Sequence, residues 1–249
     1  MSLIRPNLMS VVKQQFSFKL QAYSQVFLSL IFIQLLGILF SFGGVGGSGT
    51  SSDEFELNIH FYSADIIIVF TMLWGFITAI LITTKSYRND DFTFVTNRMS
   101  SNLANFFFLL VISFLGGLTA ILSTSLIKVI LYYFVNWKHL DFHNLMLAPE
   151  HLFLAIAATT LYIFFFCAAG YLAGTLIQIH KSFAILMPIL FVGVLFIGGL
   201  RGNTSITTIV YNFIFNESSY FLFSFKMLIM VILLFSSAFV MTNRKEVSY

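Results

Sequence analysis

Histidine and carboxylate residues gather in one short segment, where they could bind a metal ion. Residues 137–151 contain His139, Asp141, His143, Glu150 and His151. Imidazole and carboxylate groups are common zinc ligands. Their spacing matches no common zinc motif, however, and aromatic loops beside a membrane often carry histidine for its amphipathic ring. We therefore predict a solvated loop and no metal site.

A glycine-rich stretch at residues 44–51 superficially resembles a phosphate-binding loop, but it lacks the lysine that contacts the phosphates. Within it, Ser48 lies in a Gly-x-Ser-Gly pattern similar to that of the rhomboid intramembrane proteases. A nucleophilic serine would need a helix start inside the membrane and a histidine from another span. The apolar stretches offer no well-placed histidine, so we predict no catalytic residue and no cofactor in this chain.

Three charged residues lie at the ends of long apolar stretches. Asp65 precedes one stretch, Lys128 follows the next, and Lys226 lies near the start of the last. Charges within a membrane are costly and often functional, whereas near a helix end a long side chain can reach water. Two interpretations stay open: separate side chains that reach the surface, or a charge pair in an outer polar site.

The elements that must position these residues are six apolar stretches. Each has about 18 residues or more, which as a helix crosses about 30 Å of hydrocarbon. Because lipid cannot pair an open backbone, the stretches must be helices. The chain is 58% hydrophobic and 9% charged, against about 25% charged in a typical soluble domain. We predict an all-α integral membrane protein, a single transmembrane domain over residues 1–249, with spans at about 22–42, 66–84, 103–125, 152–177, 183–200 and 221–241.

The distribution of basic residues predicts the orientation. With the N-terminus inside, nine lysines and arginines lie on the cytoplasmic side and four on the outer side. Positive charge favours the cytoplasmic side. We therefore predict a multi-pass protein of the cell (plasma) membrane with both termini cytoplasmic and residues 43–57 in an outer loop. The formal charge of +3 is too small and scattered to indicate a nucleic-acid partner.

The segment before the first span mixes apolar residues with Lys13, Gln14, Gln15 and Lys19. This pattern predicts an amphipathic interfacial helix at about 7–21, the alternative being a polar extension of the first span. The third apolar stretch is overlong, continuing to residue 135, so that helix must tilt or project beyond the bilayer. In the fourth span, Gly170 and Gly174 form a GxxxG pair that permits close helix packing, within one subunit or at a dimer seam.

The cytoplasmic segment between the second and third spans, residues 85–102, has the pattern of a docking element. Asn89, Asp90 or Asp91 could cap a short helix. The apolar side chains that follow are flanked by basic ones, a combination that suits a groove on a soluble protein. The alternative is a loop whose phenylalanines dip into the membrane surface. The docking residues would be Arg88, Asp91, Phe92, Phe94, Asn97 and Arg98.

The plan of nearly the whole chain resembles the membrane subunits of ABC transporters, specifically six-span exporter-like permeases encoded apart from their ATPase. The resemblance rests on the interfacial helix, the first outer loop and the segment with Phe92, Phe94, Asn97 and Arg98. It implies that this segment is a coupling helix that contacts the ATPase. The short Gly/Ser-rich first outer loop differs from the large outer domain of some relatives.

The resemblance implies a permease subunit that pairs with a second permease, identical or similar, and with ABC ATPase subunits that bind ATP and Mg²⁺. The phenylalanine-rich spans, part of 32 phenylalanines in the chain, suit surrounding lipids and export of an amphipathic, peptide, antibiotic or lipid-like cargo, as in antimicrobial resistance. This chain would not itself be an enzyme. The alternative is a membrane-embedded enzyme or a non-transporting sensor subunit.

Overall fold

The computed structural model describes residues 8–42, 46–52, 55–61, 65–87, 98–134, 149–186, 189, 213, 217 and 219–244. Five of its helices are long and apolar enough to cross a membrane. They are α2 (Ser24–Ser41), α3 (Asp65–Ile82), α5 (Arg98–Phe134), α6 (Pro149–Ile179) and α9 (Tyr220–Arg244). A helical multi-pass membrane protein is therefore confirmed. The predicted span at 183–200 lies mostly outside the described residues, of which 183–186 are helical.

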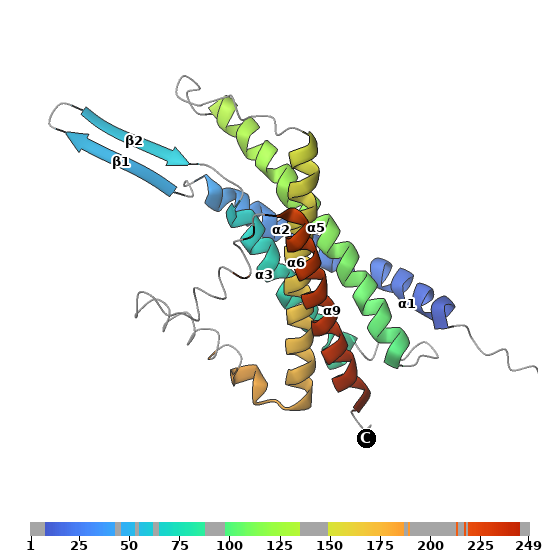
Figure 1. Ribbon diagram of the computed structural model, residues 1–249. Helices are drawn as coiled ribbons and strands as arrows, with labels where there is room; N and C mark the ends of the chain where they lie inside the picture. The colour runs from blue at the N-terminus through green and yellow to red at the C-terminus, as the bar shows by residue number, and fades with distance from the viewer. Residues whose placement is uncertain are drawn as a thin grey trace, which may run out of the picture.

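The directions of α6 and α9 are the same. Tyr162 of α6 packs against Phe223 of α9 with ring centroids 4.9 Å apart, and Tyr171 packs against Phe239 at 6.4 Å. Both helices end at what we call the basal end, the end that carries the C-terminal part of α9, and start at the distal end (Figure 1). Helix α9 therefore starts at the opposite end from where α6 finishes.

The segment between α2 and α3 contains a β-hairpin in place of the predicted loop. Strand β1 (Gly46–Ser52) pairs antiparallel with β2 (Phe55–Phe61), so that Gly46 lies opposite Phe61. The residues of β2 alternate apolar and polar, Phe-Glu-Leu-Asn-Ile-His-Phe, the period of a strand. The hairpin projects away from the helices at the distal end (Figure 1). Five of the six predicted crossing helices are thus present in the described residues, while the all-α description omits this hairpin, in which Ser48 is a strand residue.

Helix α5 is a single unbroken helix of 37 residues. At about 1.5 Å per residue it is about 55 Å long, far more than the hydrocarbon thickness of about 30 Å. It runs obliquely across the other helices (Figure 1). This agrees with the overlong apolar stretch in the sequence, and it lets α5 contact α1 at one end and reach beyond the bundle at the other.

Gly170 and Gly174 lie on the side of α6 that packs against α3 of the same chain. A Cβ atom at Gly170 would lie 2.3 Å from the carbonyl oxygen of Phe76, and one at Gly174 would lie 2.1 Å from Thr83 Oγ1. The two helix backbones therefore approach as closely as glycine allows. Of the two alternatives for the GxxxG pair, packing within one subunit accounts for this geometry.

We expect Gly170→Ala to destabilise the protein more than Gly174→Ala. The added methyl at position 170 meets the Phe76 carbonyl oxygen, a backbone atom that cannot move aside. At position 174 its nearest neighbour is the Thr83 hydroxyl, which can rotate, and the nearest backbone atom, Ile80 Cα, is 3.1 Å away. Overpacking of this kind typically costs about 1–3 kcal/mol. Thermal unfolding in detergent would measure the difference. Ser236→Ala on the exposed face of α9 is the control, and equal unfolding temperatures for all three variants would contradict the assignment.

Candidate functional site

Helix α1 (Leu8–Ala22) packs on α5 through a face that carries polar side chains. Its buried residues are Val12, Gln15 and Lys19, which recur at helical spacing and so share one face. Lys19 retains only 1% of its surface exposure. The helix lies where the sequence predicts it, but Gln15 and Lys19 are buried rather than part of a solvated polar face. A buried lysine in a membrane protein is costly and commonly has a functional role.

Lys19 begins a chain of hydrogen bonds through three helices. Its ammonium donates to Asn105 Oδ1 in α5, and Asn105 Nδ2 donates to Tyr171 Oη in α6 at 3.3 Å. Tyr171 Oη in turn donates to Asn102 Oδ1 in α5 at 2.8 Å. Because each group donates to the next, the bonds polarise one another in the same direction. We call Gln15, Lys19, Asn102, Asn105 and Tyr171 the basal cluster.

Gln15 gives the basal cluster unused hydrogen-bonding capacity. Its side chain is fully buried, and neither its amide nitrogen nor its oxygen has a hydrogen-bond partner among the described residues. Leaving such a group unsatisfied typically costs about 1–3 kcal/mol. The amide lies one turn from Lys19 on the same face of α1. A different packing of α1 on α5, in which the Gln15 amide has a hydrogen-bond partner, would remove this cost.

The two flanks of the predicted coupling segment are attached to the bundle beside this cluster. Tyr87, on the α3 side, packs edge-on against Tyr23, with 4.7 Å between ring centroids, and Tyr23 packs against Phe108 of α5 at 5.9 Å. On the other side, Arg98 Nη1 donates to the carbonyl oxygen of Thr242 in the last turn of α9 at 3.0 Å. A cation at this position complements the negative end of the helix dipole.

Arg98 therefore has a partner within its own chain, whereas the sequence analysis above assigns it to the ATPase interface. The other predicted docking residues lie outside the described part of the chain: Arg88, Asp91, Phe92, Phe94 and Asn97. The structure thus positions the two ends of the segment and leaves its docking role as a prediction.

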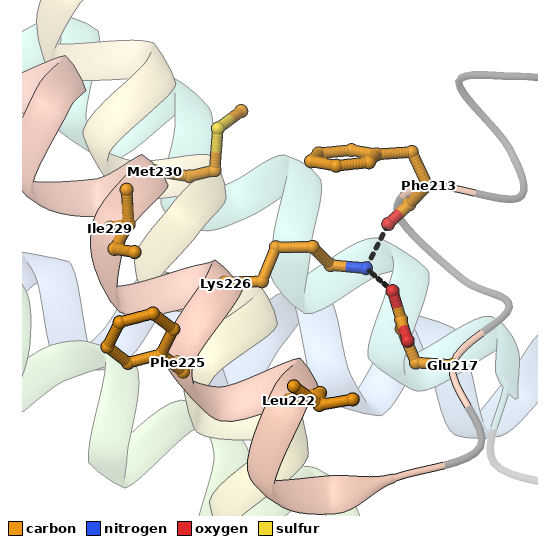
Figure 2. A pocket seen from close by; sticks show the side chains of 7 residues that line it. All are labelled: Phe213, Glu217, Leu222, Phe225, Lys226, Ile229 and Met230. Carbon is orange, nitrogen blue, oxygen red and sulfur yellow. Dashed lines mark hydrogen bonds and ion pairs between the residues drawn. The ribbon is translucent and has the colours of Figure 1, made fainter.

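At the distal end, Lys226 is one of the three charges predicted for an outer polar site. It forms an ion pair with Glu217 and donates to the carbonyl oxygen of Phe213 (Figure 2). Its ammonium also lies 4.7 Å from the Phe213 ring centroid. The outer polar site with Asp65 and Lys128 stays a prediction. Of the metal-binding residues considered in the sequence, Glu150 and His151 begin α6, while His139, Asp141 and His143 lie outside the described residues.

Asn102, Asn105 and Tyr171 have no role in the sequence-based prediction. The two asparagines recur three residues apart at the start of an apolar span, which places them on one helix face. Polar residues at that spacing in a membrane helix indicate an inward-facing bond donor or acceptor, so this signal is readable in the sequence. The partners of these residues are 66 to 86 positions away and have no such signal.

Comparison of the chain with protein-family models, with curated proteins and with solved structures finds no match.

We expect Lys19→Met to loosen α1 from the bundle. The change removes the ammonium that donates to Asn105 and leaves that amide oxygen buried without its donor, a loss of about 1–3 kcal/mol. A double-mutant cycle with Asn105→Leu should show that the two losses are not additive. Thermal unfolding and hydrogen exchange of α1 would measure this.

Lys13→Met, which changes an exposed lysine on the same helix, is the matched control. Additive effects of the Lys19 and Asn105 changes, or equal effects at positions 13 and 19, would show that the bond contributes nothing to the attachment of α1.

Proposed function

We propose that this chain is the permease subunit of an ATP-driven ABC transporter whose ATPase is a separate protein. A chain made of crossing helices with short extramembrane segments must act within the membrane or through a partner. Contacts at the basal end favour action through a partner. The flanks of the segment between α3 and α5 are tied to the α1–α2 junction through Tyr87 and to α9 through Arg98.

In the proposed mechanism, ATP and Mg²⁺ bind to the partner, and the closing of the ATPase pair moves the docked segment. Arg98 passes this movement to α9 and the start of α5, and Tyr87 passes it to the α1–α2 junction. The basal cluster connects α5 to α6 through Tyr171. Rigid-body shifts of packed helices of this kind are a common form of conformational change. The helices would then alternate between arrangements with different affinities for cargo.

In this assembly the basal end and both termini would lie on the cytoplasmic side of the cell membrane. A second permease subunit would complete the transport pathway. The proposed cargo is amphipathic, a peptide, antibiotic or lipid-like molecule exported outward. Many large apolar side chains are exposed on the helix surfaces, among them Phe32, Leu39 and Phe221. Such surfaces suit both lipid and an amphipathic cargo that enters from the inner leaflet.

The orientation can be measured with cysteine labelling. After Cys167 is replaced, a cysteine at Ser51 should react with an impermeant thiol reagent on intact cells, whereas one at Ser248 should react only after the cells are opened. The reason is that the hairpin and the C-terminal end of α9 lie at opposite ends of the bundle. Equal labelling of both positions on intact cells would contradict the proposed topology.

Coupling to the ATPase distinguishes this function from its alternatives. An ABC ATPase subunit from the same genome would be co-expressed with this chain, and its co-purification would be measured. Phe92→Ala/Phe94→Ala should reduce that co-purification at least tenfold, because aromatic anchors at an interface commonly contribute about 2 kcal/mol or more. Arg98→Gln should leave binding intact, since Arg98 is attached to α9 of its own chain, but should lower cargo-stimulated ATPase activity in nanodiscs.

The matched control is Phe114→Ala/Phe153→Ala, which removes two other phenylalanines that are exposed on the crossing helices. It should change neither co-purification nor coupling. Full binding and coupling by the Phe92/Phe94 variant would refute the docking role, and loss of binding by Arg98→Gln would place Arg98 at the interface instead.

A further inference from the structure

A pocket of about 370 Å³ lies against the distal part of α9. Its apolar walls are formed by Phe213, Leu222, Phe225, Ile229 and Met230. The four wall residues of α9 share one face with Lys226, because their spacing follows the helical period. Figure 2 shows Lys226 extending between these walls toward Glu217 and the Phe213 carbonyl. The pocket thus combines an apolar surface with one ion pair.

The position of the pocket places its ion pair near the membrane surface. Lys226 lies six residues into α9, about 9 Å from the start of a helix that crosses the membrane. The Lys226 and Glu217 side chains keep 15% and 29% of their exposure, so a ligand can reach both. Ile229 and Met230 follow one turn deeper, and Phe225 is 59% exposed. In a bilayer, this surface meets acyl chains while the charges meet the headgroups.

The pairing of the charges restricts the ligand. An anionic headgroup at Lys226 would displace Glu217 and leave that carboxylate without a cation, and a cationic one at Glu217 would leave Lys226 without an anion. A partly buried charge that loses its partner is destabilising. A ligand with both a phosphate and an ammonium group replaces the ion pair with two charge-assisted contacts. Charge complementarity therefore favours a zwitterion with an apolar tail.

We propose that this pocket binds a zwitterionic glycerophospholipid of the surrounding bilayer. The phosphate contacts Lys226, the ammonium group contacts Glu217, and one acyl chain lies along Ile229 and Met230. This site is distinct from the basal cluster and does not depend on the proposed transport function.

Native mass spectrometry of the full chain in detergent would test the proposal. The protein would be mixed with equal amounts of phosphatidylethanolamine, phosphatidylglycerol and diacylglycerol that carry the same acyl chains. We expect at least fivefold more retained phosphatidylethanolamine than either other lipid. Lys226→Gln/Glu217→Gln, which keeps hydrogen-bonding groups but removes both charges, should abolish that preference. Lys13→Gln, on the exposed side of α1, should preserve it.

A second variant keeps the test valid if the first variant does not fold. Met230→Trp fills the pocket while both charges remain, and it should lower phosphatidylethanolamine retention at least fivefold. Equal retention of the three lipids by the parent protein would show an ordinary lipid shell and overturn the proposal. A preference for phosphatidylglycerol would show an anion site at Lys226 and overturn it as well. Retention unchanged by both pocket variants would place the lipid elsewhere.

Discussion

The close approach of α6 to α3 is the constraint on which the packing of the bundle depends. Within lipid, moving an apolar helix surface from lipid to another helix gains no hydrophobic free energy. Close packing and polar bonds must therefore hold the helices together. Gly75 faces Cys167, and Gly170 and Gly174 face the backbone and side chains of α3. With one side of α6 fixed in this way, its other side presents Phe164 and Tyr171 to the aromatic residues of α9. The position of α6 therefore sets that of α9.

Polar side chains hold the remaining helices, but only a few of them bond between helices. Several hydroxyls, such as those of Thr119 and Ser123, donate to a carbonyl one turn earlier in their own helix, which satisfies the group without attaching a neighbour. Gln34 is different, because its amide donates across to the carbonyl oxygen of Gly116 at 3.2 Å. Together with the bonds of Lys19 and Arg98, it gives α5 specific attachments to α2, α1 and α9.

The sequence predicts five crossing helices well, because hydropathy over a whole span is a strong signal. The observed bounds of α2, α3, α6 and α9 differ from the predicted spans by at most three residues, whereas α5 extends well beyond its predicted span at both ends. Local signals were more easily misread. The alternation in Phe55–Phe61 indicates a strand, but the preceding glycines and serines suggested a loop. The sequence predicts an amphipathic surface helix around Lys19 and shows no link to its partner Asn105, which is 86 residues away. The pairing of Lys226 with Glu217 is unreadable for a related reason: helical spacing shows which residues share a face, but not which neighbouring segment that face meets.

The length of α5 relates the two ends of the protein to each other. Near its middle, a Cβ atom at Gly117 would lie 3.0 Å from the backbone nitrogen of Thr160, so α5 crosses α6 there at close range. From this crossing the helix extends about 28 Å to Arg98 and about 25 Å to Phe134. A rigid rod held at such a point moves its ends in opposite directions by similar amounts. A shift of Arg98 by a partner at the basal end would thus reach the distal end without any change in the α3–α6 packing.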